Sequence, residues 1–156
     1  MQKRQGIDYS AMDKNEKKQL WLAAIKLPMY SVAIMPVLLA AGMRIGEKAA
    51  VRFDQLIIFC IASLLLLLWE NLSNDIFDAQ TGVDKNNKPH SIIALVKNTK
   101  IVNISAYTSL LLGLILTLII SLRSRQEVLI LVLICTFIGY LYQGPPFRLG
   151  YKGLGE

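Results

Sequence analysis

A run of acids and amides follows directly on an uncharged apolar segment, and its residue types are those that bind hard metal ions. The apolar segment covers residues 56–69, and the run at residues 70–78 reads E-N-L-S-N-D-I-F-D. On a helix, at about 100° per residue, these acids and amides fall within about 140° of one another. Polar groups at the end of a bilayer-length helix are costly and usually mark a site. We therefore expect this face to point into a helical bundle or a cavity.

Within this run, three side chains are candidate Mg²⁺ ligands. Mg²⁺ prefers oxygen ligands and commonly binds through one or two carboxylates together with substrate phosphates. Asn74 and Asp78 are four residues apart and stack on adjacent helical turns, with Asp75 beside them. Such an array would hold a diphosphate through bridging Mg²⁺. The alternative is a polar helix end that caps its last turn and faces water, whereas the ligand spacing of an EF-hand is not present.

Two stretches of the chain resemble one family of membrane enzymes. N-D-x-x-D at residues 74–78, followed by G-x-D at 82–84, is similar to the first aspartate-rich motif of the UbiA-type membrane prenyltransferases. The longer stretch at 70–84 with P-H-S at 89–91, and the stretch Y-Q-G-P-P-F-R-L-G-Y-K-G-L-G-E at 142–156, are similar to the 1,4-dihydroxy-2-naphthoate branch. Within that branch they resemble above all the phytyl-transferring type of cyanobacteria and plastids. A lone N-D-x-x-D would be a weak signal, but two long stretches at the right separation are specific.

The resemblance implies an all-α integral-membrane helical bundle of nine helices, of which about four are present in this chain. It also implies transfer of a phytyl or polyprenyl group from its diphosphate to 1,4-dihydroxy-2-naphthoate, with loss of CO₂, in phylloquinone or menaquinone biosynthesis. The resemblance covers only the first half of the family's domain, and the sequence contains no second aspartate-rich motif. We therefore expect a fragment, a truncated gene or a split protein with little activity alone, whose missing partner is a C-terminal half.

Further site residues are expected from the charge that the departing diphosphate would carry. Metal ions and cationic side chains stabilise such a leaving group. The candidate catalytic residues are Asn74, Asp75, Asp78 and Lys152. The candidate substrate-binding residues are Asn71, Asp84, Lys85, Lys88, Arg148, Tyr142 and Tyr151. Asp84 is an alternate metal ligand or a support for the ligands, and for each basic residue the alternative is plain membrane topology.

Other residues near these motifs have two interpretations each. Tyr140, Tyr142 and Tyr151 would shield an allylic cation with their π-faces, or belong to an interfacial aromatic belt. His90 is a polar loop residue, with proton transfer as the alternative. Lys26 is interpreted first as a snorkelling anchor and second as a residue at the substrate mouth.

Long apolar runs predict the membrane helices that position these residues. Hydrophobic residues make up 54% of the 156 residues and the mean hydropathy is +0.45. The predicted helices cover residues 20–43, 53–78, 101–122 and 128–142, after a polar N-terminal segment at 1–19 and around an aspartate-rich loop at 79–100. Pro28 and Pro36 predict a kink in the first of these helices.

The basic residues predict an orientation in the membrane. The net charge is +6, but the basic residues flank apolar segments and form no patch, which argues against a nucleic-acid partner. With the N-terminus inside, twelve of the 17 Lys and Arg residues lie on the inner side and five on the outer side. We therefore expect a multi-pass protein of a bacterial inner membrane or a plastid membrane, with its N-terminus on the cytoplasmic or stromal side. This orientation places the aspartate-rich loop and the Tyr151–Lys152 end on one face.

Two other functions remain open from the sequence. The same fold could use 4-hydroxybenzoate or homogentisate as the aromatic acceptor. A non-catalytic four-helix membrane protein that binds Mg²⁺ or assembles with a partner is the third reading.

Overall fold

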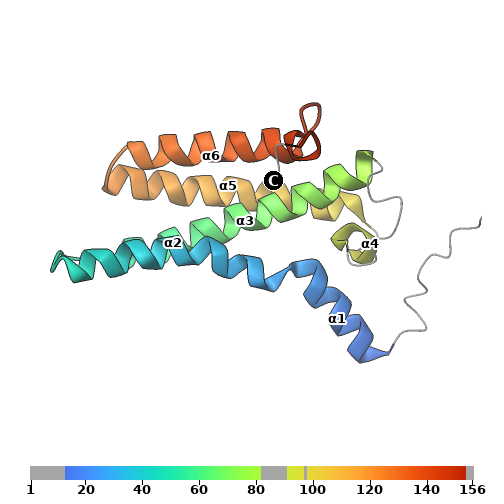
Figure 1. The fold of residues 1–156 in the computed structure, drawn as a ribbon, viewed down its shortest axis with the longest axis horizontal. Coiled ribbons are helices and arrows are strands. Elements are labelled where there is room, and N and C mark those ends of the chain that lie inside the picture. Colours follow the sequence, from blue (N-terminus) through green and yellow to red (C-terminus); the bar gives the residue numbers. More distant parts are fainter. Residues whose placement is uncertain (1–12, 82–90, 97, 154–156) are drawn as a thin grey trace, which may run out of the picture.

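The computed structural model describes residues 13–81, 91–96 and 98–153, and all regular structure in these ranges is helical. The elements are α1 (Lys14–Ile25), α2 (Leu27–Gly46), α3 (Phe53–Thr81), α4 (Ile92–Val96), α5 (Thr99–Arg123), α6 (Glu127–Gln143) and the 3₁₀ turn η2 (Leu149–Tyr151). Figure 1 shows their arrangement. The predicted all-α fold is confirmed.

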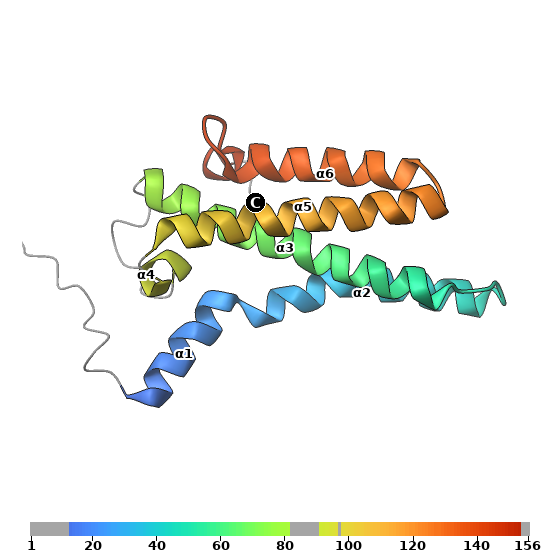
Figure 2. The same cartoon turned by 180° about the vertical axis from the view of Figure 1, so that it is seen from behind.

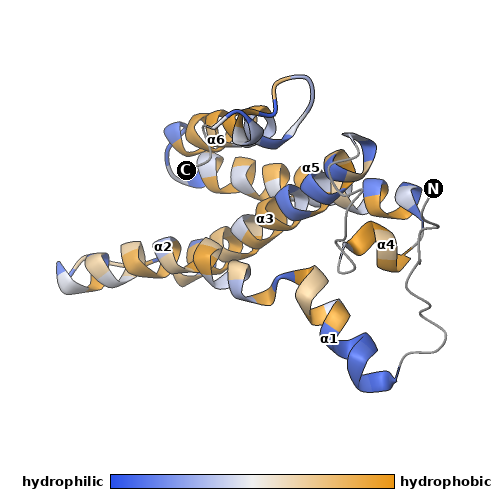
Figure 3. Ribbon diagram, turned by 45° about the vertical axis from the view of Figure 1, so that its right-hand side comes forward, coloured by the Kyte–Doolittle hydropathy of each residue, from blue (hydrophilic) through white to orange (hydrophobic). Residues whose placement is uncertain are grey.

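Three helical stretches are long and apolar enough to cross a membrane: Lys14–Gly46, Phe53–Thr81 and Thr99–Arg123. The fourth, α6, is apolar but has 17 residues, so its length of about 26 Å falls slightly short of a hydrocarbon core of about 30 Å. Apolar residues run along these helices, and hydrophilic residues gather towards the ends of the bundle and the start of α1 (Figure 3). The prediction of a membrane bundle of about four helices is therefore confirmed, with three full-length helices and one shorter one.

Helix α3 is the centre of the bundle, because it contacts α2, α4, α5 and α6. Figures 1 and 2 show α3 and α5 lying side by side in views from opposite sides. The two helices approach closely at Gly113 of α5, where an added Cβ would lie 3.0 Å from Leu66. Small residues at helix contacts let backbones approach in this way in membrane bundles.

The first predicted helix is interrupted at Lys26. Lys26 has left-handed backbone angles (φ 53°, ψ 46°), and its N–H closes α1 on the carbonyl of Ala23. Pro28 follows in the first turn of α2, where its missing N–H costs no helical hydrogen bond. The chain changes direction at the break between α1 and α2, before Pro28 (Figure 1). Pro36 lies inside α2, and the helix continues through it.

Local capping explains where the observed helices differ from the predicted ranges. Asp13 forms a capping box with Glu16, so α1 begins at Lys14, within the segment predicted as the polar N-terminal segment. Asn98 accepts hydrogen bonds from the N–H groups of Lys100 and Ile101, and it therefore starts α5 at Thr99. The aspartate-rich loop predicted at 79–100 thus includes the end of α3, the short α4 and the start of α5.

The apolar core lies beside the polar end of α3. Leu72 and Ile76 are buried there against Val102 and Ala106 of α5, next to Trp69. Helical spacing places Leu72 and Ile76 on the side of α3 opposite the acids. Burial of these residues fixes the rotation of α3, and the acidic face is thereby held towards the other elements.

Candidate active site

The last turns of α3 bury the acids and amides of the polar run. Asp75 and Asp78 are 4% and 0% exposed, and Asn71 is 6% exposed. Asn74 is half-buried. Carboxylates are almost never fully buried unless they are paired. Each of the two therefore requires a partner, and the structure supplies different partners for the two.

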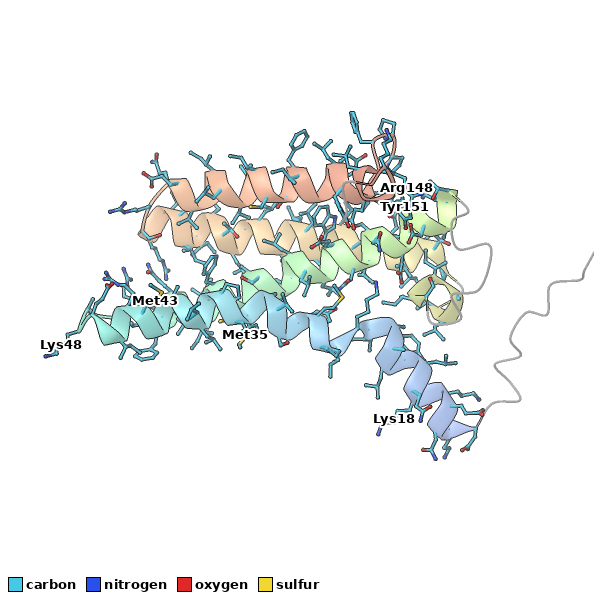
Figure 4. All side chains as sticks on the ribbon, in the orientation of Figure 1. Lys18, Met35, Met43, Lys48, Arg148 and Tyr151 are labelled. Atoms are coloured by element: carbon cyan, nitrogen blue, oxygen red, sulfur yellow. The ribbon has the colours of Figure 1, made fainter. Side chains whose placement is uncertain are left out.

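Asp78 is paired with residues from the end of the described chain. Arg148 Nη2 lies 2.5 Å from Asp78 Oδ1, and the hydroxyl of Tyr151 donates to the same oxygen at 2.6 Å. Arg148 also donates to the hydroxyl of Thr81, one turn further along α3. Its guanidinium carbon stands 4.2 Å from the centre of the Tyr151 ring, a cation–π arrangement. Figure 4 shows Arg148 and Tyr151 together over the end of α3.

The turn after α6 brings these two residues to Asp78. Arg148 adopts left-handed angles (φ 45°) and directly precedes η2. Because a 3₁₀ helix has three residues per turn, Arg148 and Tyr151 lie on one side of it. The end of α6 is attached to α3 by a buried hydrogen bond of 2.6 Å from Gln143 Nε2 to Ser73 Oγ. The hydroxyl of Tyr140 donates to the carbonyl of Pro145 at 2.8 Å and stabilises the turn between them.

Asp75 is held by the opposite side of the site. Its Oδ2 accepts the N–H of Ile92 at 3.0 Å, and its Oδ1 lies 3.7 Å from Lys26 Nζ. The break between α1 and α2 therefore directs Lys26 towards Asp75. This contact places Lys26 next to a candidate ligand, as the second interpretation of Lys26 expects.

The two carboxylates contact different neighbours because residues three apart on a helix are separated by about 60° around its axis. Asp75 reaches Lys26 and α4, whereas Asp78 reaches the turn after α6. Asn71 lies on the same face, and its Nδ2 has no hydrogen-bond partner among the described residues, although Tyr30 is close enough to interact with it.

The donor set suits Mg²⁺ in its chemistry. Two buried carboxylates with the amides of Asn71 and Asn74 beside them offer the hard oxygen ligands that Mg²⁺ prefers. Within the described ranges, no three His, Cys, Asp or Glu side chains form a cluster able to hold a metal ion by themselves. Oxygen atoms of a substrate would have to complete the coordination, as is common for Mg²⁺.

The remaining predicted residues are less central or lie elsewhere. Tyr142 is exposed and its ring packs against Gly150, and Tyr140 makes an edge contact with Phe77 at 5.9 Å between ring centres. Lys152 is exposed directly after η2, beside the Arg148–Tyr151 pair. The predicted residues outside the described ranges are Asp84, Lys85, Lys88 and His90.

Three polar residues of the site were not identified from the sequence. Ser73, Thr81 and Gln143 connect α3 to the end of α6 and to Arg148. Gln143 had a usable signal, because it follows an apolar helix directly and lies within a stretch that resembles the family. Hydroxyls on membrane helices most often bond to their own backbone, so Ser73 and Thr81 gave no comparable signal.

Comparison with known proteins shows the family to which the chain belongs. Residues 33–156 match the model of the UbiA prenyltransferase family, so the chain belongs to that family. It is 42% identical to a 2-carboxy-1,4-naphthoquinone phytyltransferase of Synechocystis sp. over 140 residues, which are 89% of this chain and 45% of that protein. It is 41% identical over 140 residues to the chloroplastic 2-carboxy-1,4-naphthoquinone phytyltransferase of Arabidopsis thaliana, covering 89% of this chain and 36% of that protein.

A more distant relative is named for the transfer of a different prenyl group. The chain is 28% identical over 138 residues to a 1,4-dihydroxy-2-naphthoate octaprenyltransferase of Mycobacterium tuberculosis, covering 87% of this chain and 47% of that protein. The chain thus spans less than half the length of each of these relatives. No solved structure matches the chain significantly.

Proposed function

We propose that this chain forms part of a membrane prenyltransferase that transfers a phytyl or related polyprenyl group from its diphosphate to 1,4-dihydroxy-2-naphthoate, with loss of CO₂. The observation that carries the proposal is the pairing of buried Asp78 with Arg148 and Tyr151, which lie 70 and 73 residues further along the chain. Both stretches that resemble the naphthoate branch thereby meet in one site. The names of the relatives favour a naphthoate-type acceptor over 4-hydroxybenzoate or homogentisate.

In this proposal Asn74, Asp75 and Asp78 hold Mg²⁺ together with the substrate diphosphate. The metal, when bound, neutralises the charge that develops on the departing diphosphate. The cationic side chains next to the carboxylates do the same from the protein side. Arg148 and Lys26 lie against Asp78 and Asp75, and Lys152 follows the Arg148 turn, so all three can donate hydrogen bonds to phosphate oxygens.

The carboxylates also position the cations. Asp78 and Thr81 hold the Arg148 guanidinium in a fixed orientation, and the ring of Tyr151 lies below it. A guanidinium fixed before substrate binds does not have to reorganise while charge develops. The face of the Tyr151 ring is suited to stabilise an allylic cation, because π-faces attract cations.

The proposed reaction breaks one bond to the diphosphate and one to the carboxylate, and it forms one C–C bond. The allylic C–O bond breaks, and its electron pair leaves with the diphosphate. The ring carbon of the naphthoate that bears the carboxylate attacks the allylic cation and forms the new C–C bond. The carboxylate leaves as CO₂, and the electron pair of the broken C–C bond restores the aromatic ring.

The orientation of the site in the membrane is part of the proposal. Lys26, Asp75 and Arg148 lie at one end of the bundle, which supports a single membrane face for the whole site. The predicted distribution of basic residues assigns this face to the cytoplasmic or stromal side.

A chimeric enzyme tests the acceptor. Residues 1–156 would replace the matched part of the Synechocystis relative, and the chimera would be assayed with phytyl diphosphate, Mg²⁺ and each acceptor in turn. We expect 1,4-dihydroxy-2-naphthoate to react at least about tenfold faster than 4-hydroxybenzoate or homogentisate, because specific polar contacts reject acceptors that lack matching groups. The unmodified Synechocystis enzyme is the control. Equal or faster reaction of homogentisate would contradict the proposed acceptor.

Substitution Asp75→Asn in the chimera is expected to lower prenyl transfer about 100-fold, because a loss of one preorganised charge in a site costs rate on this order. Asn keeps the shape and can still accept the N–H of Ile92, but it loses the charge that attracts Lys26. Asp54→Asn is the matched control, since Asp54 lies on the same helix in an exposed pair with Arg52. Initial rates of both variants decide the question, and a D75N rate near that of D54N would argue against a role for Asp75.

A further inference from the structure

A cavity of about 620 Å³ lies between α2 and α3, at the end of the bundle away from the candidate active site. This volume is within the usual range of small-molecule sites, about 300–1,000 Å³. Small side chains of α2 make room for it, including Ala33, Ala40 and Ala41, while Phe59 of α3 forms part of the opposite wall. The cavity is therefore an apolar groove that runs along two membrane helices.

The near end of the cavity, at Ser63, lies twelve residues or about 18 Å along α3 from Asp75, and only its far end is well separated from the acids. Gln55 of its wall and Asp75 are twenty residues apart on α3, which corresponds to about 30 Å along the helix. Figure 4 shows the same separation, with Met43 and Lys48 at one end of the molecule and Arg148 and Tyr151 at the other. The far end of the cavity, which carries Arg44 and Arg52, therefore lies at the opposite membrane face.

Charge at this end of the cavity is positive. Arg44 from the last turn of α2 and Arg52 from the connection to α3 both line it, and both are exposed. Arg52 forms an ion pair with Asp54, with 3.6 Å between Nη2 and Oδ2. Arg44 lies at the C-terminal end of α2. An apolar groove within the bilayer that ends at two guanidinium groups matches an acyl chain joined to a phosphate, because guanidinium binds phosphate in bidentate fashion.

We propose that this cavity binds one acyl chain of an anionic phospholipid of the surrounding bilayer, with the lipid phosphate between Arg44 and Arg52. Charge complementarity favours an anionic lipid over a zwitterionic one, because each basic residue at the membrane surface adds to the attraction for anionic headgroups. The proposal is independent of the prenyl-transfer reaction, since it involves none of the residues assigned to that site.

The test uses the 156-residue chain purified in a mild detergent, with equimolar dioleoyl phosphatidylglycerol and dioleoyl phosphatidylcholine as probes. Native mass spectrometry measures which lipid stays bound. We expect one retained lipid with about a tenfold preference for phosphatidylglycerol. Substitution of both cavity arginines, R44Q/R52Q, should reduce this preference to about one, and Ala41→Phe should reduce binding of both lipids by filling the groove.

The matched control is R123Q/R125Q, which removes two exposed arginines that do not line the cavity. Arg123 is the last residue of α5, and Arg125 lies in the connection to α6. The control should keep the tenfold preference, and far-UV circular dichroism should show unchanged helicity for all variants. If the double variant is not helical, R44Q and R52Q are measured singly. Unchanged lipid preference in R44Q/R52Q, equal loss in R123Q/R125Q, or displacement of the lipid by geranylgeraniol would overturn the proposal.

Discussion

Replacement of Asp78 by Asn is expected to lower the rate of prenyl transfer by the chimeric enzyme about 10³-fold. The reason is that Asp78 serves two functions in the proposed site, as a Mg²⁺ ligand and as the group that holds Arg148. Its side chain is completely buried, and Asn preserves its shape and its hydrogen bond from Tyr151 while removing the charge. Loss of a single oriented group from a preorganised site costs about 10²–10³ in rate, and the upper end of this range is expected for a residue that serves both functions.

The same substitution is expected to destabilise the fold, and the experiment has to separate the two effects. Removing one partner of a buried ion pair typically costs about 3–5 kcal/mol, because the other charge is left without compensation. Ser73→Ala is a suitable control, since it breaks the buried bond to Gln143 without changing any charge. Thermal unfolding in detergent and initial rates would be measured for both variants. S73A gives the loss of rate that accompanies a given loss of stability. If D78N loses no more rate than its own loss of stability predicts on this scale, Asp78 has no chemical role.

The 156-residue chain by itself is expected to show little or no turnover, at least about 10³-fold below the chimera. The matched residues cover only 45% and 36% of its two more similar relatives, and the described residues offer two buried carboxylates for a metal ion but no three-carboxylate metal cluster. Fewer oriented charges around the leaving group mean weaker stabilisation of the transition state. The measurement is product formation by the purified chain with phytyl diphosphate, 1,4-dihydroxy-2-naphthoate and Mg²⁺.

Binding separates an incomplete site from a misfolded protein. Isothermal titration with Mg²⁺ and inorganic diphosphate should detect weak binding to the chain, because its two buried carboxylates attract the metal complex, and none to D78N, which keeps only one of them. Helicity from circular dichroism provides the folding control. Turnover by the isolated chain equal to that of the chimera would refute the prediction and show that residues 1–156 contain a complete site.

Much of the fold follows from the pattern of apolar runs. Residues 53–78 and 101–122 were predicted as helices, and α3 and α5 cover these ranges with extensions of one to three residues at their ends. Such long apolar segments have few alternatives in a bilayer, because every backbone N–H and C=O must be satisfied within the segment. The break at Lys26 was not predicted at that residue, since it depends on tertiary contacts: α1 packs against α4, whereas α2 packs against α3.

The candidate site was predicted in part. The shared face of Asp75 and Asp78 follows from helical spacing alone, and both side chains are buried. Their different partners could not be predicted, because a separation of 70 residues between Asp78 and Arg148 is bridged only when α6 returns along α3. Tyr142 and Tyr151 looked equivalent in the sequence, but the turn after α6 brings only Tyr151 to Asp78.

By itself, the sequence determined that this chain is an all-helical membrane protein, which residues of α3 are polar, and which family the two motifs resemble. These properties depend on residue types and on spacing within single segments, where helix geometry and the apolar bilayer impose strong rules. Only the tertiary structure decided that Lys26 faces Asp75, that Arg148 and Tyr151 hold Asp78, and that Gln143 attaches α6 to α3. Such contacts join residues far apart in the chain, and they depend on the rotation and docking of whole helices, which local patterns do not encode.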